Sequence, residues 1–290
     1  MTVAVLGPGA VGGALAVRVE RSGRRVVCVA RRETARALVS DGLTLDGAGP
    51  ALRARPAAVE RLTEPVDLLL VAVKAPELEA ALARIEAPAG LVLPLMNGLD
   101  HIGTIRARLG RRVAAGSISR FEAYREGRTR IVEASGPGVV TMASEEASTT
   151  DLGRAAELLA RAGVEAHILE SEKAVLWDKA ARLAVLAAAT AATGRPVGEL
   201  RADSEWRPLL ETGLEEACAV ASADGAPASP AEQWAIIDSL PASLTTSTAR
   251  DVAAGRPSEL DAITGAVVRA GRRLGVPTPT LEELLRRCPA

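Results

Sequence analysis

Three glycines near the N-terminus restrict the fold of this chain more than any other feature. Gly7, Gly9 and Gly12 form the pattern Gly-x-Gly-x-x-Gly between the apolar run 3–6 and the helical pattern 11–21. A strand, a tight turn and a helix in this order are typical of a dinucleotide-binding unit, in which N–H groups at the helix N-terminus bind the diphosphate. The predicted contact residues are Gly7, Pro8, Gly9, Ala10, Val11 and Gly12.

The rest of the N-terminal half alternates short apolar runs with helical spacing. Runs rich in Val and Leu occur at 26–30, 68–73 and 91–95, and helical patterns lie between them at 33–40 and 77–86. Near-continuous apolar strands separated by helices indicate a parallel sheet that is covered on both faces. The predicted fold class is therefore α/β, with a Rossmann-type doubly wound sheet.

The pattern changes twice beyond residue 110. β-like stretches at 114–119, 130–134 and 139–142 are expected to extend the sheet as antiparallel strands. A helix at 151–162 and a strand at 165–169 follow, and after them all patterns are helical. The predicted helices are 172–193, 205–223, 230–238, 262–274 and 281–287. We therefore predict a dinucleotide-binding domain at 1–170 and an all-helical substrate and catalytic domain at 171–290.

The residues after the second strand indicate which dinucleotide binds. The run 26–30 continues into Arg31 and Arg32, where an NAD site would place Asp or Glu for the ribose 2′-hydroxyl. A guanidinium matches a 2′-phosphate in charge and geometry, whereas the alternative is a pair of solvated surface arginines. Glu33 comes too late in the turn to hold the hydroxyl. The sequence thus favours NADP(H) over NAD.

Composition argues against several other classes of protein. A net charge of −1 and 2% aromatic residues do not predict the basic surface and stacking rings that nucleic-acid binding needs. Three separated cysteines and two histidines offer no metal-ligand set. The longest apolar stretch, 183–192, is too short to cross a membrane, and no signal-peptide pattern precedes the first strand. We expect a cytoplasmic protein without a metal, a nucleic-acid partner or a membrane partner.

Two polar positions follow predicted strands. Lys74 comes directly after the run 68–73, and Asn97-Gly98 follows the run 91–95. Ligands gather at the carboxyl ends of parallel strands, although Asn-Gly is also a common turn pair. Both positions are candidates for contact with a bound dinucleotide.

Three more polar motifs lie in the helical half. Trp-Asp-Lys ends at Lys179 in the first long helix, where a lysine is otherwise a solvated charge. Thr246-Ser247 and the segment 258–261, Ser-Glu-Leu-Asp, also read as ordinary helix N-caps. None of these motifs defines chemistry alone.

Taken in order, these motifs resemble the ketopantoate reductase (2-dehydropantoate 2-reductase) family over nearly the whole chain. The resemblance implies a Rossmann-type domain, a helical domain and an active site in the cleft between them. It also implies NADPH-dependent reduction of a 2-keto acid, ketopantoate to pantoate, on the route to pantothenate.

The resemblance also implies individual roles. Lys179 would be the general acid that protonates the developing alkoxide, with Glu259 orienting substrate and lysine. A positioned ammonium both stabilises and neutralises that oxyanion. The remaining implied contacts are Gly7, Gly9, Gly12, Arg31 and Lys74 for the cofactor, Asn97 for cofactor and substrate, and Thr190 and Ser247 for the substrate.

The chain departs from the family at two positions. The family usually has asparagines four and eight residues after the catalytic lysine, and here these residues are Leu183 and Ala187. We hypothesise that Arg182, on the lysine face of the helix, binds the substrate carboxylate, while the apolar pair accepts a less polar acyl group. The alternative is that Arg182 points into solvent.

Three interpretations therefore stay open. The first is a ketopantoate reductase, and the second is a related enzyme of secondary metabolism that acts on a less polar keto substrate. The third is an NADPH-binding redox sensor without catalysis. An opine- or 3-hydroxyacid-type dehydrogenase is disfavoured, because it would be expected to carry a catalytic histidine in the helical domain and no histidine follows His167. The expected partner is a small-molecule keto acid, and a homodimer is a candidate assembly.

Overall fold

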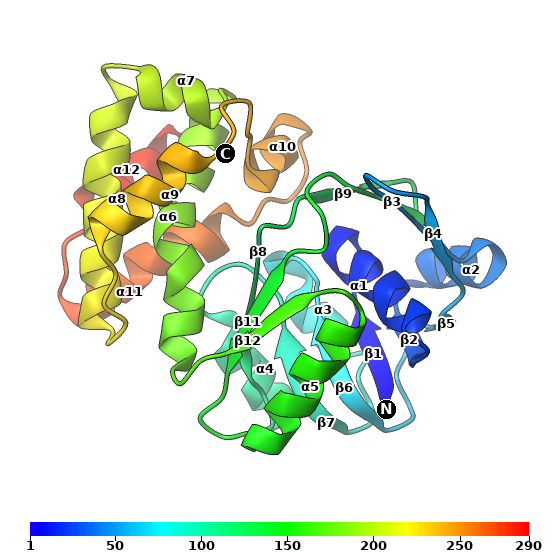
Figure 1. Ribbon diagram of the computed structural model, residues 1–290. Helices are drawn as coiled ribbons and strands as arrows, with labels where there is room; N and C mark the ends of the chain where they lie inside the picture. Colours follow the sequence, from blue (N-terminus) through cyan, green and yellow to red (C-terminus); the bar gives the residue numbers. More distant parts are fainter. Residues whose placement is uncertain (290) are drawn as a thin grey trace. The chain divides into compact units, whose positions relative to one another are not determined.

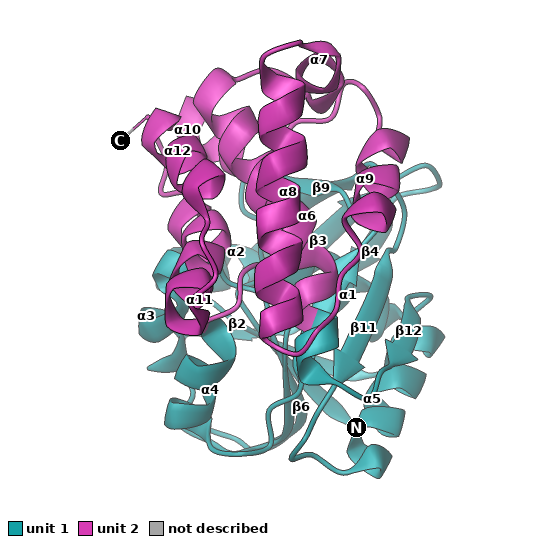
Figure 2. Ribbon diagram, turned by 90° about the vertical axis from the view of Figure 1, so that its left-hand side faces the viewer, with its two compact units in different colours: residues 1–96, 101–175 teal, residues 97–100, 176–290 magenta. Residues whose placement is uncertain are grey.

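The computed structural model describes residues 1–289 and divides into two compact units (Figure 2). Unit 1 comprises residues 1–96 and 101–175, and unit 2 comprises residues 97–100 and 176–290. Sequence patterns placed the boundary after residue 170 and assigned 97–100 to the first domain. In the structure, unit 1 ends at Val175, within a helix, and the four-residue segment 97–100 groups with the helical residues.

Unit 1 is built on a five-stranded parallel sheet with the order β5-β2-β1-β6-β7 (Figure 1). Its strands are β1 (Thr2–Leu6), β2 (Arg25–Val29), β5 (Ala57–Val59), β6 (Val66–Val71) and β7 (Ala89–Pro94). The central strand β1 is buried over its last four residues, as expected for a parallel sheet with both faces covered. The predicted doubly wound α/β class is confirmed.

The helices of unit 1 are α1 (Ala10–Arg21), α2 (Arg32–Asp41), α3 (Leu78–Leu82), α4 (His101–Leu109) and α5 (Thr149–Arg161). Helix α1 contacts β1 and β2, and α5 contacts β7. The helix predicted at 77–86 is shorter than expected. A 3₁₀ turn, η1 (Ala75–Glu77), precedes α3, and α3 ends at Leu82, before Ile85 forms a β-bridge with Leu62. Helix α4 was not predicted.

The expectation that residues 114–142 extend the main sheet was wrong. A three-stranded sheet, ordered β12-β11-β8, contains β8 (Ala115–Ser119), β11 (Val139–Ala143) and β12 (Glu165–Ile168). A four-stranded sheet, ordered β4-β3-β10-β9, contains β3 (Leu43–Asp46), β4 (Leu52–Ala54), β9 (Ala123–Glu126) and β10 (Arg130–Glu133). Its strands contact α1, and Ile131 of β10 is fully buried. Helix α1 therefore contacts both this sheet and the main one.

Unit 2 is helical. Its elements are α6 (Glu172–Thr193), which begins in unit 1, α7 (Val197–Ala202), α8 (Trp206–Ala223), α9 (Pro230–Ser239), α10 (Ser247–Ala253), the π-helix η2 (Asp261–Gly265), α11 (Ala266–Leu274) and α12 (Pro279–Arg287). Fully buried residues of α6, such as Val185, share one apolar core with Leu210 of α8 and Leu281 of α12. Helix α6 has the bounds predicted from the sequence.

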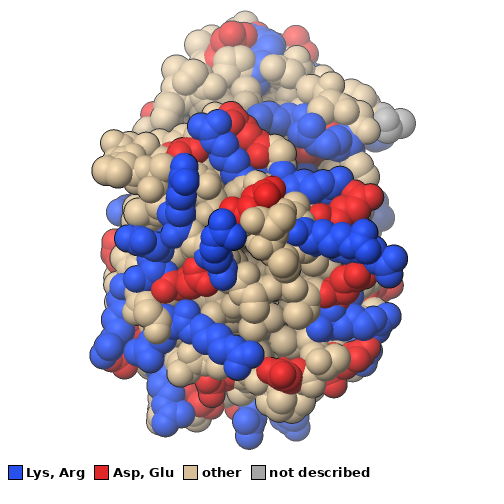
Figure 3. All heavy atoms as spheres, turned by 90° about the vertical axis from the view of Figure 1, so that its right-hand side faces the viewer, with Lys and Arg blue, Asp and Glu red and all other residues tan. Residues whose placement is uncertain are grey.

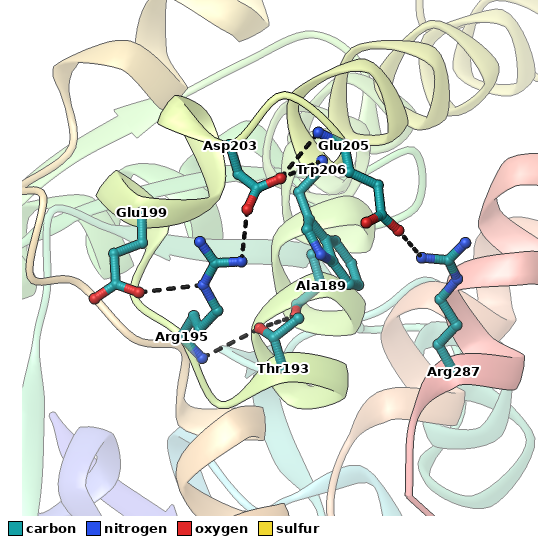
Figure 4. A network of polar contacts seen from close by, with 8 residues as sticks. All are labelled: Ala189, Thr193, Arg195, Glu199, Asp203, Glu205, Trp206 and Arg287. Carbon is teal, nitrogen blue, oxygen red and sulfur yellow. Dashed lines mark hydrogen bonds and ion pairs between the residues drawn. The ribbon is translucent and has the colours of Figure 1, made fainter.

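A polar network fixes the C-terminal end of α6 (Figure 4). Arg195 forms ion pairs with Asp203 at 2.9 Å and Glu199 at 3.1 Å. Asp203 also accepts hydrogen bonds from the backbone N–H groups of Glu205 and Trp206, where α8 begins. These contacts, led by the Arg195 hydrogen bond, hold the pKa of the Asp203 carboxyl below its usual range. The network thereby joins the adjoining ends of α6, α7 and α8.

The molecular surface is mixed in charge on the face shown in Figure 3, where basic and acidic side chains are interspersed. Within residues 1–289, no helix is long and apolar enough to cross a membrane. The same residues contain no cluster of three His, Cys, Asp or Glu side chains that could hold a metal ion.

Candidate active site

The glycine-rich turn joins β1 to α1 at the carboxyl end of the main sheet. Gly7 has φ 85°, and a Cβ atom on Gly12 would lie 2.3 Å from the Gly7 carbonyl oxygen, so both positions require glycine. A Cβ on Gly9 would instead meet no atom of the described chain within 4 Å. Gly9 is the N-cap of α1 and provides no side-chain cap. The open space and the helix N-terminus therefore fit a diphosphate group.

Arg31 and Arg32 both form ion pairs. Arg31 is the N-cap residue of α2, and its Nη2 lies 2.9 Å from Glu77 Oε1 at the end of η1. Arg32 pairs with Glu60 at 3.0 Å, and Glu33 pairs elsewhere, with Arg128. Arg31, the residue predicted to bind a 2′-phosphate, thus lies at the end of β2 and is well exposed. Its acidic partner, Glu77, could not be identified from the sequence.

Lys74 is exposed and lies between β6 and η1, where its carbonyl accepts a hydrogen bond from the Glu77 N–H at 2.9 Å. Because β6 is the direct neighbour of β1, Lys74 and the glycine turn follow the carboxyl ends of adjacent strands. Unit 1 therefore gathers the glycine turn, Arg31 and Lys74 at one edge of its sheet.

Asn97 belongs to unit 2, although it comes shortly after β7 in the chain. Its Nδ2 donates a hydrogen bond to Glu259 Oε2 at 3.1 Å. The next residue, Gly98, has φ 91°, and a Cβ there would lie 2.1 Å from the Ala262 carbonyl oxygen in η2. The Asn-Gly pair therefore packs directly against the π-helix that follows Glu259, and only glycine fits at its second position.

The remaining residues of the segment 97–100 are also anchored in unit 2. Leu99 packs against the apolar core of that unit. Asp100 Oδ2 lies 2.8 Å from Arg269 Nη2, and the same guanidinium reaches Asp261 Oδ1 at 2.7 Å. Apolar and ionic contacts thus fix the loop that carries Asn97.

Lys179 is a partly buried residue of α6. Burial, and secondly the Arg182 guanidinium, lowers the pKa of Lys179 to about 8, while the carboxylates of Glu259 and Asp178 act in the opposite direction. Glu259 is itself only 7% exposed. An ammonium group that titrates near neutral pH beside a buried carboxylate is suited to proton transfer.

The tryptophan of the Trp-Asp-Lys motif has a structural role. Trp177 is 2% exposed, and its Nε1 donates a hydrogen bond to Asp224 Oδ2 at the C-cap of α8, at 2.9 Å. This contact anchors the turn of α6 from which Lys179 projects.

Arg182 does not extend into solvent. Its side chain is 13% exposed, and its Nη1 donates to Gln233 Oε1 of α9 at 2.9 Å and to the Asp178 carbonyl oxygen. Gln233 is itself buried. The guanidinium is therefore fixed in position beside Lys179.

Thr190 and Ser247 are linked through Thr246. The Thr190 side chain is fully buried, and its hydroxyl donates to the Leu186 carbonyl at 2.6 Å and lies 2.7 Å from the Thr246 hydroxyl. Thr246 caps α10, as its N-cap interpretation predicted, by accepting from the Ala249 N–H at 3.1 Å. Ser247 is the first, exposed residue of that helix. The Thr190 hydroxyl is thus engaged within the protein, next to the residue that precedes Ser247.

The two departures from the family pattern differ in environment. Leu183 is partly exposed, whereas Ala187 is fully buried. An amide side chain at Ala187 would have to enter a packed interior, so only Leu183 leaves an accessible apolar surface on α6.

Comparison with known proteins matches both units. The family model described as "Ketopantoate reductase PanE/ApbA" matches residues 3–146, and "Ketopantoate reductase PanE/ApbA C terminal" matches residues 173–288. A 2-dehydropantoate 2-reductase of Caulobacter vibrioides is 30% identical over 96% of this chain and 94% of its own. Together with the glycine turn and Lys179, these matches define an oxidoreductase that depends on a nicotinamide dinucleotide. The chain belongs to the ketopantoate reductase family.

Solved structures agree with this assignment. A PanE/ApbA family ketopantoate reductase from Ralstonia eutropha is 28% identical, with a TM-score of 0.87 over 99% of this chain and 96% of its own. D-mandelate dehydrogenase, solved with NADH and anilino(oxo)acetate, is 23% identical, with a TM-score of 0.89 over 99% and 97% of the chains. The second likeness shows a shared fold.

Proposed function

We propose that this protein reduces a 2-keto acid to the 2-hydroxy acid with NADPH, and that ketopantoate, on the route to pantothenate, is its substrate. The observation that carries the proposal is the grouping of Lys179, Glu259 and Asn97 in unit 2. The Lys179 ammonium, with a pKa of about 8, acts beside the Glu259 carboxylate. This carboxylate accepts a hydrogen bond from the Asn97 amide at 3.1 Å.

The chemistry assigned to these residues is proton transfer. The reduced nicotinamide, when bound, supplies the hydride to the ketone carbon. Lys179 Nζ donates a proton to the ketone oxygen as negative charge develops there, and the resulting amine regains its proton from solvent. Glu259 favours the protonated lysine electrostatically, and the hydrogen bond from Asn97 orients the Glu259 carboxylate.

The preference for NADPH is assigned to Arg31. Its guanidinium stands at the end of β2, where a 2′-phosphate needs a cationic, forked donor. Gly7, Gly9 and Gly12, with Pro8, Ala10 and Val11 in the same turn, would hold the diphosphate. Lys74 and Asn97 would contact the nicotinamide half.

The substrate carboxylate is assigned to Arg182, with Ser247 as a second contact. Gln233 holds the guanidinium, so Arg182 is positioned before substrate arrives and a bidentate pair with a carboxylate costs little side-chain entropy. Thr190 acts through Thr246 on the position of Ser247. Replacing Arg182 with Met is expected to raise KM for the acid roughly tenfold or more, because a charge-assisted hydrogen bond contributes about 1.5–3 kcal/mol.

The matched control for Arg182→Met is Arg272→Met, since Arg272 is an exposed arginine of the same unit that pairs with Glu282 at 2.9 Å. Arg272→Met should leave KM unchanged. An unchanged KM in Arg182→Met, with NADPH affinity preserved in both variants, contradicts the role given to Arg182.

The partly exposed Leu183 favours a second candidate function, a reductase of this type that takes a less polar keto acid. NADPH oxidation should be measured with ketopantoate and with 2-keto acids that carry progressively larger apolar side chains. A kcat/KM that is highest for ketopantoate supports the first proposal. A higher kcat/KM for an apolar acid, with ketopantoate at background, rules out ketopantoate as the substrate but supports the same reduction chemistry. No turnover with any acid contradicts both.

The thiols do not support a redox sensor that acts through cysteine. Burial raises the pKa of Cys28 to about 12 and the pKa values of Cys218 and Cys288 to about 11, so these cysteines lack the thiolate character of reactive sensors. The cytoplasmic location and the homodimer stay predictions. Light scattering on the purified protein tests the dimer.

A further inference from the structure

The Arg31–Glu77 ion pair lies at the site proposed for the dinucleotide. Strands β2 and β6 flank β1 on its two sides. Arg31 follows β2 and Glu77 follows β6, and their side chains meet at 2.9 Å. The pair therefore joins the ends of two strands across the end of β1, where the glycine turn begins.

The neighbouring Arg32 has an acidic partner on the opposite side of β2 from the partner of Arg31. Glu60 follows β5, which lies on the far side of β2 from β1, and holds Arg32 at 3.0 Å. Two adjacent arginines thus pair in opposite directions along the sheet edge. Of the two, Arg31 is the one whose partner lies on the side of the glycine turn.

Glu77 affects the two cofactors differently. A 2′-phosphate needs the donors of Arg31, one of which, on Nη2, already faces the Glu77 carboxylate at 2.9 Å. The negative charge of the phosphate is also repelled by this carboxylate. A 2′-hydroxyl is neutral and can donate a hydrogen bond to a carboxylate. The ion pair therefore weakens the attraction for NADPH and leaves a site that also accepts NADH.

We propose that Glu77 determines cofactor selectivity in this protein, by restraining Arg31 and so reducing the preference for NADPH over NADH. The inference rests on the proposed cofactor site and adds a residue to it. Both side chains are well exposed, 68% for Arg31 and 48% for Glu77, so the effect is moderate. Exposed ion pairs contribute up to about 1 kcal/mol, which predicts roughly a twofold to fivefold change in affinity.

The test is direct binding of NADPH and NADH, measured by titration calorimetry at one ionic strength without any keto acid. Wild type is compared with Glu77→Gln and with the matched control Glu60→Gln, which releases Arg32 instead. Circular dichroism checks that all three proteins are folded.

Glu77→Gln is expected to tighten NADPH binding by roughly twofold to fivefold and to leave NADH binding unchanged or weaker. Glu60→Gln should leave the ratio of the two dissociation constants unchanged. An unchanged ratio in Glu77→Gln, or an equal shift in Glu60→Gln, overturns the role of Glu77 while the cofactor site stands. Failure of the wild type to bind either nucleotide overturns the cofactor site and this inference together.

Discussion

The side-chain amide of Asn97 donates a hydrogen bond to the carboxylate of Glu259 at 3.1 Å, although 162 positions separate the two residues in the chain. Both belong to unit 2. Glu259 is 7% exposed, and a buried carboxylate is costly unless other groups satisfy its oxygens. The amide thus stabilises the carboxylate that acts on Lys179.

Changing either partner should lower turnover. Asn97→Ala removes the hydrogen bond and Glu259→Gln removes the charge, and each is expected to reduce kcat/KM by roughly tenfold to a hundredfold, because a hydrogen bond to a charged group contributes about 1.5–3 kcal/mol. The double variant should lose less than the two single losses combined. Steady-state kinetics on the four proteins give the coupling energy, and strictly additive losses would mean that the two side chains act independently.

The pH dependence of reduction should follow Lys179. The proton donor is the ammonium form, and the pKa of this group is about 8. We therefore expect kcat/KM for keto acid reduction to be constant at lower pH and to fall about tenfold per pH unit above pH 8. Oxidation of the hydroxy acid, which needs the neutral amine, should rise over the same range. A reduction rate that stays level up to pH 10 would exclude Lys179 as the proton donor.

The lowered pKa also predicts that Lys179 reduces stability. Between pH 8 and the ordinary value of 10.5, the unfolded chain binds a proton that the folded chain has released, so wild-type stability rises with pH in this window. Lys179→Met should therefore be more stable than wild type at pH 7, by up to about 3 kcal/mol, and inactive. Urea unfolding of wild type and Lys179→Met at pH 7 and pH 10 measures the difference in stability, which should be smaller at pH 10.

Gly98→Ala should disrupt the loop that carries Asn97. The added Cβ would lie 2.1 Å from the Ala262 carbonyl oxygen, in addition to the cost of φ 91°. Gly110→Ala is the control, because Gly110 has φ 88° but open space around its Cβ position. We expect about 1–3 kcal/mol of destabilisation in the control and a larger loss, with reduced kcat, in Gly98→Ala. Equal thermal unfolding of the two variants would show that the close contact is unimportant.

Thr190→Val tests the link between α6 and α10. The substitution keeps the side-chain volume but removes the contact with the Thr246 hydroxyl at 2.7 Å, at a cost of about 1–3 kcal/mol in stability. If Thr190 positions Ser247 through Thr246, KM for the keto acid should rise while kcat changes little. Thr193→Val is the matched control in the same helix, since its hydroxyl forms local hydrogen bonds, to the Ala189 carbonyl at 2.8 Å and from the Arg195 N–H at 3.1 Å. An equal KM in both variants would contradict the positioning role.

The sequence predicted the parts of the fold that have a strong periodic signal. The predicted bounds of helix α6 equal the observed ones. The apolar runs that predicted β1, β2, β6 and β7 lie within two residues of the observed strands. The strands β3, β4 and β5 were missed because they are only three or four residues long, and β3 and β4 also contain polar residues. Helix α10 was missed as well, although Thr246, its N-cap, had been recognised as a possible one.

The pairings among the candidate site residues could not be predicted from the sequence. The contact between Asn97 and Glu259 depends on how a loop after β7 packs on a π-helix, and no local pattern encodes that. The partner of Arg31 depends on strand order, which places the ends of β2 and β6 on the two sides of β1. Such partners follow from tertiary structure, whereas the type of chemistry follows from residue identity.

The anchoring of the segment 97–100 limits how this chain can exchange parts with a relative. A helical half cut out at residue 171 would lack Leu99 in its core, the Asp100 partner of Arg269 and the amide that holds Glu259. Recombination between two family members at that boundary would give each helical half a foreign loop. A working hybrid of this chain therefore needs the loop after β7 and the helical half from the same parent, although 75 residues of unit 1, 101–175, separate them in the sequence.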